Sequence, residues 1–130
     1  MWADRIARAL LVGVGLVNLA PGAAALSTSR LESLYGVRVG DADLEVLLRH
    51  RAALLAIVGG GLLAGTFVPS IRVPTIAAAA TSMGSYVALT AAVGPTNPQS
   101  SRVRAVDVGA LAALAVAVGL GSRSLRPAAG

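Results

Sequence analysis

Four apolar stretches divide the chain, and each is long enough, or nearly so, to cross a lipid bilayer. A transmembrane helix needs about 20 mostly apolar residues. The stretches are 6–26, 52–68, 73–93 and 106–120, with a polar segment, 27–51, between the first two. The pattern predicts an all-α integral membrane protein, a four-helix bundle that forms a single transmembrane domain over residues 1–130.

The polar segment carries the signal for a short helix of its own. Ser29 and Glu32 have the spacing of a capping box, and Gly36 is suited to end the helix that they begin. We expect an interfacial helix over 30–35, lying on the membrane between the first and second crossings, with Tyr35 at headgroup depth.

A second helix is predicted further along the same segment. Asp41 or Asp43 can cap its start, and Glu45 with Arg49 has the i,i+4 order that supports a helix. Because the stretch 52–68 is slightly short for a crossing, we expect this helix to begin outside the bilayer and to run straight into it.

Proline and glycine mark the later turns. A brief turn over 69–74 makes the second and third crossings antiparallel neighbours, and a break over 94–98 precedes the last helix. Arg102, Arg104 and Asp107 are then expected to open that last helix.

The first stretch has two interpretations. Arg5 and Arg8 before an apolar run that ends in Ala23–Ala25 also resemble a secretory signal with its small-residue cleavage site. As a retained crossing, the stretch holds the polar Asn18 and ends at Pro21-Gly22, which suits a helix that bends or stops near the membrane surface.

Composition supports the membrane interpretation and excludes several functions. The chain is 55% hydrophobic and 13% charged, whereas a soluble domain carries about 25% charged residues. It has no cysteine and a single histidine, so we expect no disulfide, no metal site and no bound cofactor. The net charge of +5 comes from scattered arginines, and 3% of residues are aromatic; we therefore expect no nucleic-acid partner.

Arginine placement gives the orientation. With four crossings, the termini and the second loop share one side, which carries five arginines and one acid; the other side carries six arginines and five acids. The arginines of the first side are Arg5, Arg8, Arg72, Arg123 and Arg126. The net charges of +4 and +1, together with the basic start of the first helix, predict a multi-pass protein of the cell membrane with cytoplasmic termini.

Polar residues gather at one membrane face. By topology, the starts of the second and fourth crossings lie on the same side, with the interfacial helix. The candidates are Glu32, Tyr35, Arg49, His50, Arg51, Arg102, Arg104 and Asp107. One hypothesis is a polar cap in which Arg49, His50 or Arg51 pairs with Asp107 or Glu32.

Three other interpretations of the same residues stay open. They are interfacial anchors that balance the acids, a site for an anionic lipid headgroup or a quinone, or proton-linked transport that uses His50 and Asp107. No Gly-x-Ser-x-Gly or phosphate-loop motif is present, and Gly59-Gly60-Gly61 lies in an apolar run. We therefore predict no catalytic residues and no enzyme activity.

Small residues recur at four-residue spacing along three of the predicted helices. This pattern allows helices to approach closely in lipid, within one chain or between copies. The rows are Ala52, Ala56, Gly60 and Ala64, with Gly61 and Gly65 beside them, then Ala80 and Gly84, and finally Gly109, Ala113, Ala117 and Gly121.

Three short motifs carry a family resemblance: LESLYGV at 31–37, LLRHRA at 47–52 and DV-x-AL at 107–111. With these motifs the chain resembles small four-helix bacterial membrane proteins, loosely the DoxX-like group. The resemblance implies a four-helix bundle in the bacterial inner membrane and an accessory role in a membrane assembly.

Two functions follow from the sequence. The first is a non-enzymatic accessory or assembly subunit of a larger membrane complex, or a homo-oligomer, surrounded by membrane lipids. The alternative is a binder or carrier of a small amphiphile, an anionic lipid or a quinone, at the face lined by Arg49, His50 and Arg51.

Overall fold

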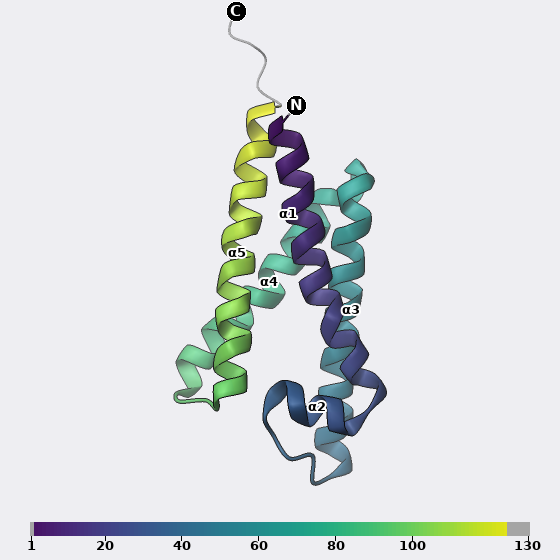
Figure 1. Cartoon of the computed structure of the whole chain (residues 1–130), viewed down its shortest axis with the longest axis vertical. Helices are drawn as coiled ribbons and strands as arrows, with labels where there is room; N and C mark the ends of the chain where they lie inside the picture. Colours follow the sequence, from purple (N-terminus) through teal and green to yellow (C-terminus); the bar gives the residue numbers. More distant parts are fainter. Residues whose placement is uncertain (1, 125–130) are drawn as a thin grey trace, which may run out of the picture.

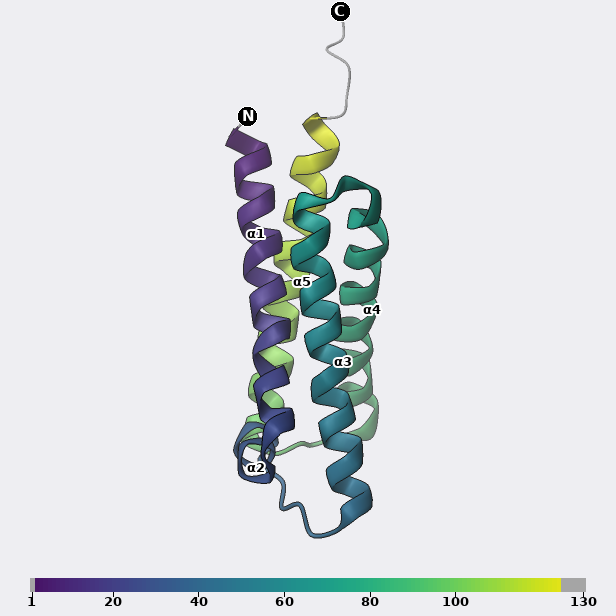
Figure 2. The ribbon, with the colours of Figure 1, turned by 90° about the vertical axis from the view of Figure 1, so that its right-hand side faces the viewer.

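The computed structural model describes residues 2–124 of the chain, with side chains to residue 121. Four long helices run side by side along one axis, and a short helix lies across the end opposite the termini (Figures 1 and 2). The elements are α1 (Trp2–Leu19), the 3₁₀ helix η1 (Ala20–Leu26), α2 (Thr28–Tyr35), α3 (Ala42–Phe67), α4 (Pro69–Val93) and α5 (Pro98–Ser124). The predicted all-α four-helix bundle and its extra short helix are confirmed.

The surface of the bundle is suited to lipid. Four helical segments are long and apolar enough to cross a membrane, and they are Trp2–Leu26, Ala42–Phe67, Pro69–Val93 and Pro98–Gly121. Large apolar side chains point outward along them, including Ile57 at 69%, Val73 at 76% and Val93 at 81% exposed. Such a surface would be unfavourable in water, and soluble proteins seldom expose extended apolar patches. The chain is therefore a multi-pass membrane protein.

Helix α2 begins at Thr28, two residues before the predicted start at residue 30. Ser27, in extended backbone, accepts a hydrogen bond from Arg30 N, so Ser27 and not Ser29 is the N-cap. Glu32 does not complete a capping box, since its Oε1 accepts from Val39 N at 2.8 Å and holds the following loop. Gly36 ends the helix as expected, with a φ of 63° that favours glycine.

The buried face of α2 is turned toward protein rather than lipid. Leu31 and Tyr35 are 0% and 5% exposed and pack with Ala24 of η1 and Ala52 of α3. The apolar side of this helix therefore packs inside the protein, and the expected headgroup depth of Tyr35 stays a prediction. Helix α2 forms a floor at one end of the bundle (Figure 1).

Helix α3 runs unbroken from the polar segment into the apolar one, as its two sequence signals predict. Asp41 accepts from Leu44 N at 2.8 Å and is the N-cap, which leaves Asp43 within the first turn. Glu45 forms the expected i,i+4 ion pair with Arg49 at 2.6 Å. The helix thus begins ten residues before the apolar stretch that marks the crossing.

The connection between α3 and α4 is shorter than predicted. Only Val68 separates the two helices, because α4 starts at Pro69 and continues through Pro74. Proline is well accepted at a helix start. Arg72 then folds back and donates hydrogen bonds to the carbonyl oxygens of Gly65 and Thr66, at 3.0 and 2.9 Å. These carbonyls at the end of α3 would otherwise lack partners.

The helices enclose one core in the cyclic order α1, α3, α4, α5, each packing on its two neighbours. The backbones of α1 and α3 approach each other closely where the helices cross, since a Cβ added to Gly59 would lie 2.6 Å from Gly15 O. The small-residue rows are only partly internal. Ala52 and Ala117 are buried, whereas a Cβ on Gly60, Gly84 or Gly109 would meet nothing within 4 Å.

The orientation prediction is only partly covered by the structure. Of its five arginines, Arg126 lies outside the described residues and Arg123 outside the described side chains. The structure does place both ends of the described chain at the same end of the bundle (Figure 1).

Candidate functional site

A cavity of about 550 Å³ opens at the end of the bundle opposite the termini. It lies between the α1–η1 junction, α2, α3 and α5. Its walls are mainly apolar and include Val17, Leu34, Leu55, Val103 and Val106. The volume falls within the range of about 300–1,000 Å³ that is typical of small-molecule sites.

The cavity exists because α1 and α5 pack closely only in the half of the bundle near the termini. There the buried side chains of the two helices meet, and they are Ala7, Leu11, Val14, Ala110, Leu114 and Ala117. Towards the other end the two helices separate in Figure 1 and α2 lies below the space between them. In η1, Gly22 sits against Ala56, where an added Cβ would lie 2.7 Å from the alanine Cβ. This contact keeps η1 on α3 and leaves the α5 side open.

Two polar clamps hold α2 in place as the floor of the cavity. At its start, Arg49 donates to Ala25 O at 2.9 Å, while Thr28 Oγ1 donates to Glu45 Oε1 at 2.9 Å. At its end, Asn97 Nδ2 donates to Tyr35 O at 2.9 Å and to Gly36 O at 3.0 Å. Helix α2 is thereby fixed both to α3 and to the start of α5.

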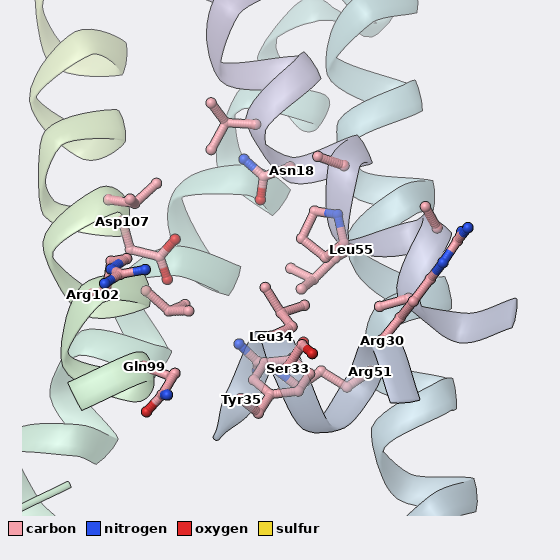
Figure 3. A pocket seen from close by; sticks show the side chains of 17 residues that line it. Asn18, Arg30, Ser33, Leu34, Tyr35, Arg51, Leu55, Gln99, Arg102 and Asp107 are labelled. Carbon is pink, nitrogen blue, oxygen red and sulfur yellow. Dashed lines mark hydrogen bonds between the residues drawn. The ribbon is translucent and has the colours of Figure 1, made fainter. Parts of the chain in front are cut away.

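The polar part of the cavity is cationic. Arg30 of α2, Arg51 of α3 and Arg102 of α5 line it, together with one acid, Asp107 (Figure 3). The formal charges leave an excess of two positive charges. Arginine is suited to bind phosphate and carboxylate groups, since its planar fork donates two parallel hydrogen bonds.

Arg51 is the most firmly positioned of these cations. Its guanidinium carbon lies 4.5 Å from the ring centroid of Tyr86 and 5.5 Å from that of Tyr35. Its Nε also donates to Tyr35 Oη at 3.2 Å. A cation within about 6 Å of a ring centroid is attracted by the ring face, so the two tyrosines hold the charge at the cavity wall.

Two groups that can accept hydrogen bonds stand opposite these donors. Asp107 is half-buried and within electrostatic range of Arg51, and it makes no hydrogen bond or ion pair among the described residues. Asn18 is 3% exposed, and its Nδ2 donates to Val14 O at 3.0 Å and to Met83 Sδ at 3.5 Å. Figure 3 shows the carboxyl group of Asp107 and the amide oxygen of Asn18 pointing into the cavity.

The structure brings together four of the predicted site residues and disperses the others. Tyr35, Arg51, Arg102 and Asp107 line the cavity. Glu32 holds the Val39 backbone instead. Arg104 is exposed and does not line the cavity.

The predicted pairing of Arg49, His50 or Arg51 with Asp107 or Glu32 is not found among residues 2–121. Arg49 pairs with Glu45, and exposed His50 lines a separate, shallower depression beside Ser82. Successive residues on an α-helix point about 100° apart, so three in a row cannot face one site.

Sequence reasoning missed other cavity residues, chiefly Asn18, Arg30, Ser33 and Gln99. Asn18 did carry a signal, because a polar side chain within a crossing is costly unless it is satisfied or used. Arg30 and Gln99 carried none, since their place depends on how α2 docks against α5.

The arrangement is suited to binding a ligand that has both an anionic group and an apolar part. No three His, Cys, Asp or Glu side chains gather into a possible metal site within the described part of the chain. What the cavity offers is an apolar wall, arginine side chains from three elements and two acceptors.

The chain matches no protein-family model, no curated protein and no solved structure. The resemblance to the DoxX-like group accordingly stays a prediction, and the cavity itself has to supply the argument for function.

Proposed function

We propose that this protein binds or carries a small anionic amphiphile in the cavity between α1, α2, α3 and α5. One observation supports this proposal above the others. Three arginines from three different elements line a largely apolar space of about 550 Å³ that opens towards the surface of the bundle.

Electrostatics favours an anionic ligand. Cations beside lipid need a counter-charge or water, and Asp107 is the one acid among the described residues that line the cavity. A phosphate or carboxylate headgroup would supply the missing negative charge, while its tail would lie against the apolar wall. Arg51, already held between two tyrosines, can bind such a headgroup with little loss of side-chain freedom.

A matched pair of variants tests this proposal. Arg102 lines the cavity, and Arg104, two residues along the same helix, does not. Both are exposed, so both variants are expected to fold. We expect Arg102→Gln to weaken binding of a monoacyl phosphate by about 10- to 100-fold, since a hydrogen bond to a charged group contributes about 1.5–3 kcal/mol.

Arg104→Gln should leave that affinity unchanged. Binding is measured by native mass spectrometry of the purified protein with dodecyl phosphate. Equal affinities for the native protein and Arg102→Gln, or no binding by the native protein, would contradict the proposal.

A second function, association as an accessory subunit or homo-oligomer, has its own support. Gly60, Gly84 and Gly109 lie on three helices where an added Cβ meets open space, so another helix could pack closely there. The mass of the protein extracted from its membrane in polymer discs tests this. A single copy without a protein partner would count against association.

The finer location is also a proposal. The basic residues Arg5 and Arg8 at the start of the first crossing support cytoplasmic termini in a bacterial inner membrane. The cavity, at the opposite end of the bundle, would then lie in the outer leaflet.

A further inference from the structure

Asn18 has an amide oxygen that no protein group uses. The described hydrogen bonds of its side chain both start from Nδ2, to Val14 O and to Met83 Sδ, and none reaches Oδ1. Every fully enclosed side-chain polar atom of the described residues has a partner. Since Oδ1 has none while the residue is 3% exposed, this oxygen must border the open space of the cavity, as Figure 3 shows.

Such an acceptor constrains the ligand that can occupy the cavity. Oδ1 is open to water while the cavity is open, and a ligand that covered it without offering a donor would leave it without a hydrogen bond, which weakens binding. The Nδ2 bonds fix the amide, so the oxygen cannot turn to another partner. A ligand that reaches Oδ1 is therefore favoured when it carries a hydrogen-bond donor at that point.

The position of Asn18 shows where on a ligand this donor lies. Asn18 contacts Met83 on α4, whereas Arg51 contacts Tyr86, three residues nearer the end of α4. Three residues of helix correspond to about 4.5 Å. The free oxygen is thus nearer the middle of the bundle than the cationic group, on the side where the tail of a bound amphiphile lies.

Asp107 is a second acceptor, on the α5 wall. On α5 it follows Arg102 by five residues, about 7.5 Å further from the cavity end. Its carboxyl oxygens also have no hydrogen-bond partner among the described residues, so the α5 wall too holds an acceptor deeper than its arginine.

We propose that the ligand carries a free hydroxyl group on the tail side of its anionic group, and that Asn18 Oδ1 accepts a hydrogen bond from that hydroxyl. This inference rests on the proposed function and specifies its ligand. A monoacyl glycerol phosphate, with its free glycerol hydroxyl, and a 3-hydroxy fatty acid share this chemistry. An anionic amphiphile without the hydroxyl leaves Oδ1 unsatisfied.

Paired ligands test the hydroxyl directly on the native protein. The first pair is 1-oleoyl glycerol 3-phosphate and its analogue that lacks the 2-hydroxyl; the second is 3-hydroxytetradecanoate and tetradecanoate. We expect the hydroxylated member of at least one pair to bind about tenfold more tightly in native mass spectrometry. The pair that shows the preference identifies the source of the ligand.

Two variants assign the effect to Asn18. Asn18→Leu keeps the size of the side chain but removes the acceptor, and it should bind both members of a pair equally. Thr90→Val removes another buried polar group, on α4 and outside the cavity lining, and should retain the native preference.

Equal binding of both members by the native protein would overturn the inference and leave the proposed function intact, because the anionic group would still be bound. A preference that survives in Asn18→Leu would overturn the role of Asn18. Failure of every anionic amphiphile to bind would instead remove the proposed function itself.

Discussion

At the scale of single residues, two neighbouring glycines have opposite surroundings. Gly59 faces the backbone of α1, where an added Cβ would lie 2.6 Å from Gly15 O, and Gly60 faces open space. A side chain at Gly59 would therefore force the two helices apart, since a neighbouring backbone cannot move aside as a flexible side chain can.

We expect Gly59→Ala to destabilise the protein by about 1–3 kcal/mol, the usual cost of overpacking. Gly60→Ala should leave stability unchanged or raise it by up to about 1 kcal/mol, because alanine favours helix over glycine. Unfolding in mixed micelles, followed by circular dichroism, measures both. Equal stability of the two variants would show that the α1–α3 crossing is looser than the structure has it.

Residue identity also explains what the sequence could and could not predict. The i,i+4 pair of Glu45 and Arg49 was predictable because its geometry is local to one helix. The choice of Ser27 over Ser29 as the cap was not, since both serines precede the same apolar residues. The position of Arg51 was not predictable either, because its partners Tyr35 and Tyr86 belong to two other elements.

At the scale of elements, α2 depends on contacts distant in sequence. Asn97 caps α5 by accepting from Ser100 N at 2.7 Å, and the same side chain binds the carbonyl oxygens at the end of α2. One amide therefore joins two segments whose bonded residues lie 61 and 62 positions apart in the sequence. The cavity floor and the start of α5 should loosen together when it is lost.

We expect Asn97→Ala to lower stability by about 0.5–2 kcal/mol, as is usual for a lost N-cap, and to speed hydrogen exchange over residues 28–36. Thr96→Ala, which removes only an exposed bond to Ser101, is the control and should leave that exchange unchanged. Hydrogen exchange followed by mass spectrometry measures the rates. If α2 exchanged at the native rate in Asn97→Ala, Asn97 would not be what fixes the floor.

The four long helices were predictable as elements, whereas the cavity was not. Each crossing is a continuous apolar run, which can be recognised from consecutive residues of the sequence. The cavity instead arises because α1 and α5 pack in one half of the bundle only. No local pattern encodes the distance between α1, which ends at Leu19, and α5, which begins at Pro98.

At the scale of the whole molecule, the chain's lack of cysteine permits a clean test of orientation. Trp2→Cys and Gly40→Cys place single thiols at exposed positions near opposite ends of the bundle. With cytoplasmic termini, a membrane-impermeant maleimide added to intact cells should label Gly40→Cys and leave Trp2→Cys unlabelled. The reverse pattern would put the termini, and not the cavity, on the outside.

The cation–π contacts of Arg51 with Tyr35 and Tyr86 have an optical consequence. These are the only tyrosines in the chain, so every phenol chromophore of the protein lies against one cavity cation. The single tryptophan, Trp2, stands at the far end of the bundle and is 69% exposed. An anionic ligand that binds the guanidinium should therefore change near-ultraviolet tyrosine absorbance while tryptophan emission stays constant, which makes the native protein its own unlabelled binding sensor.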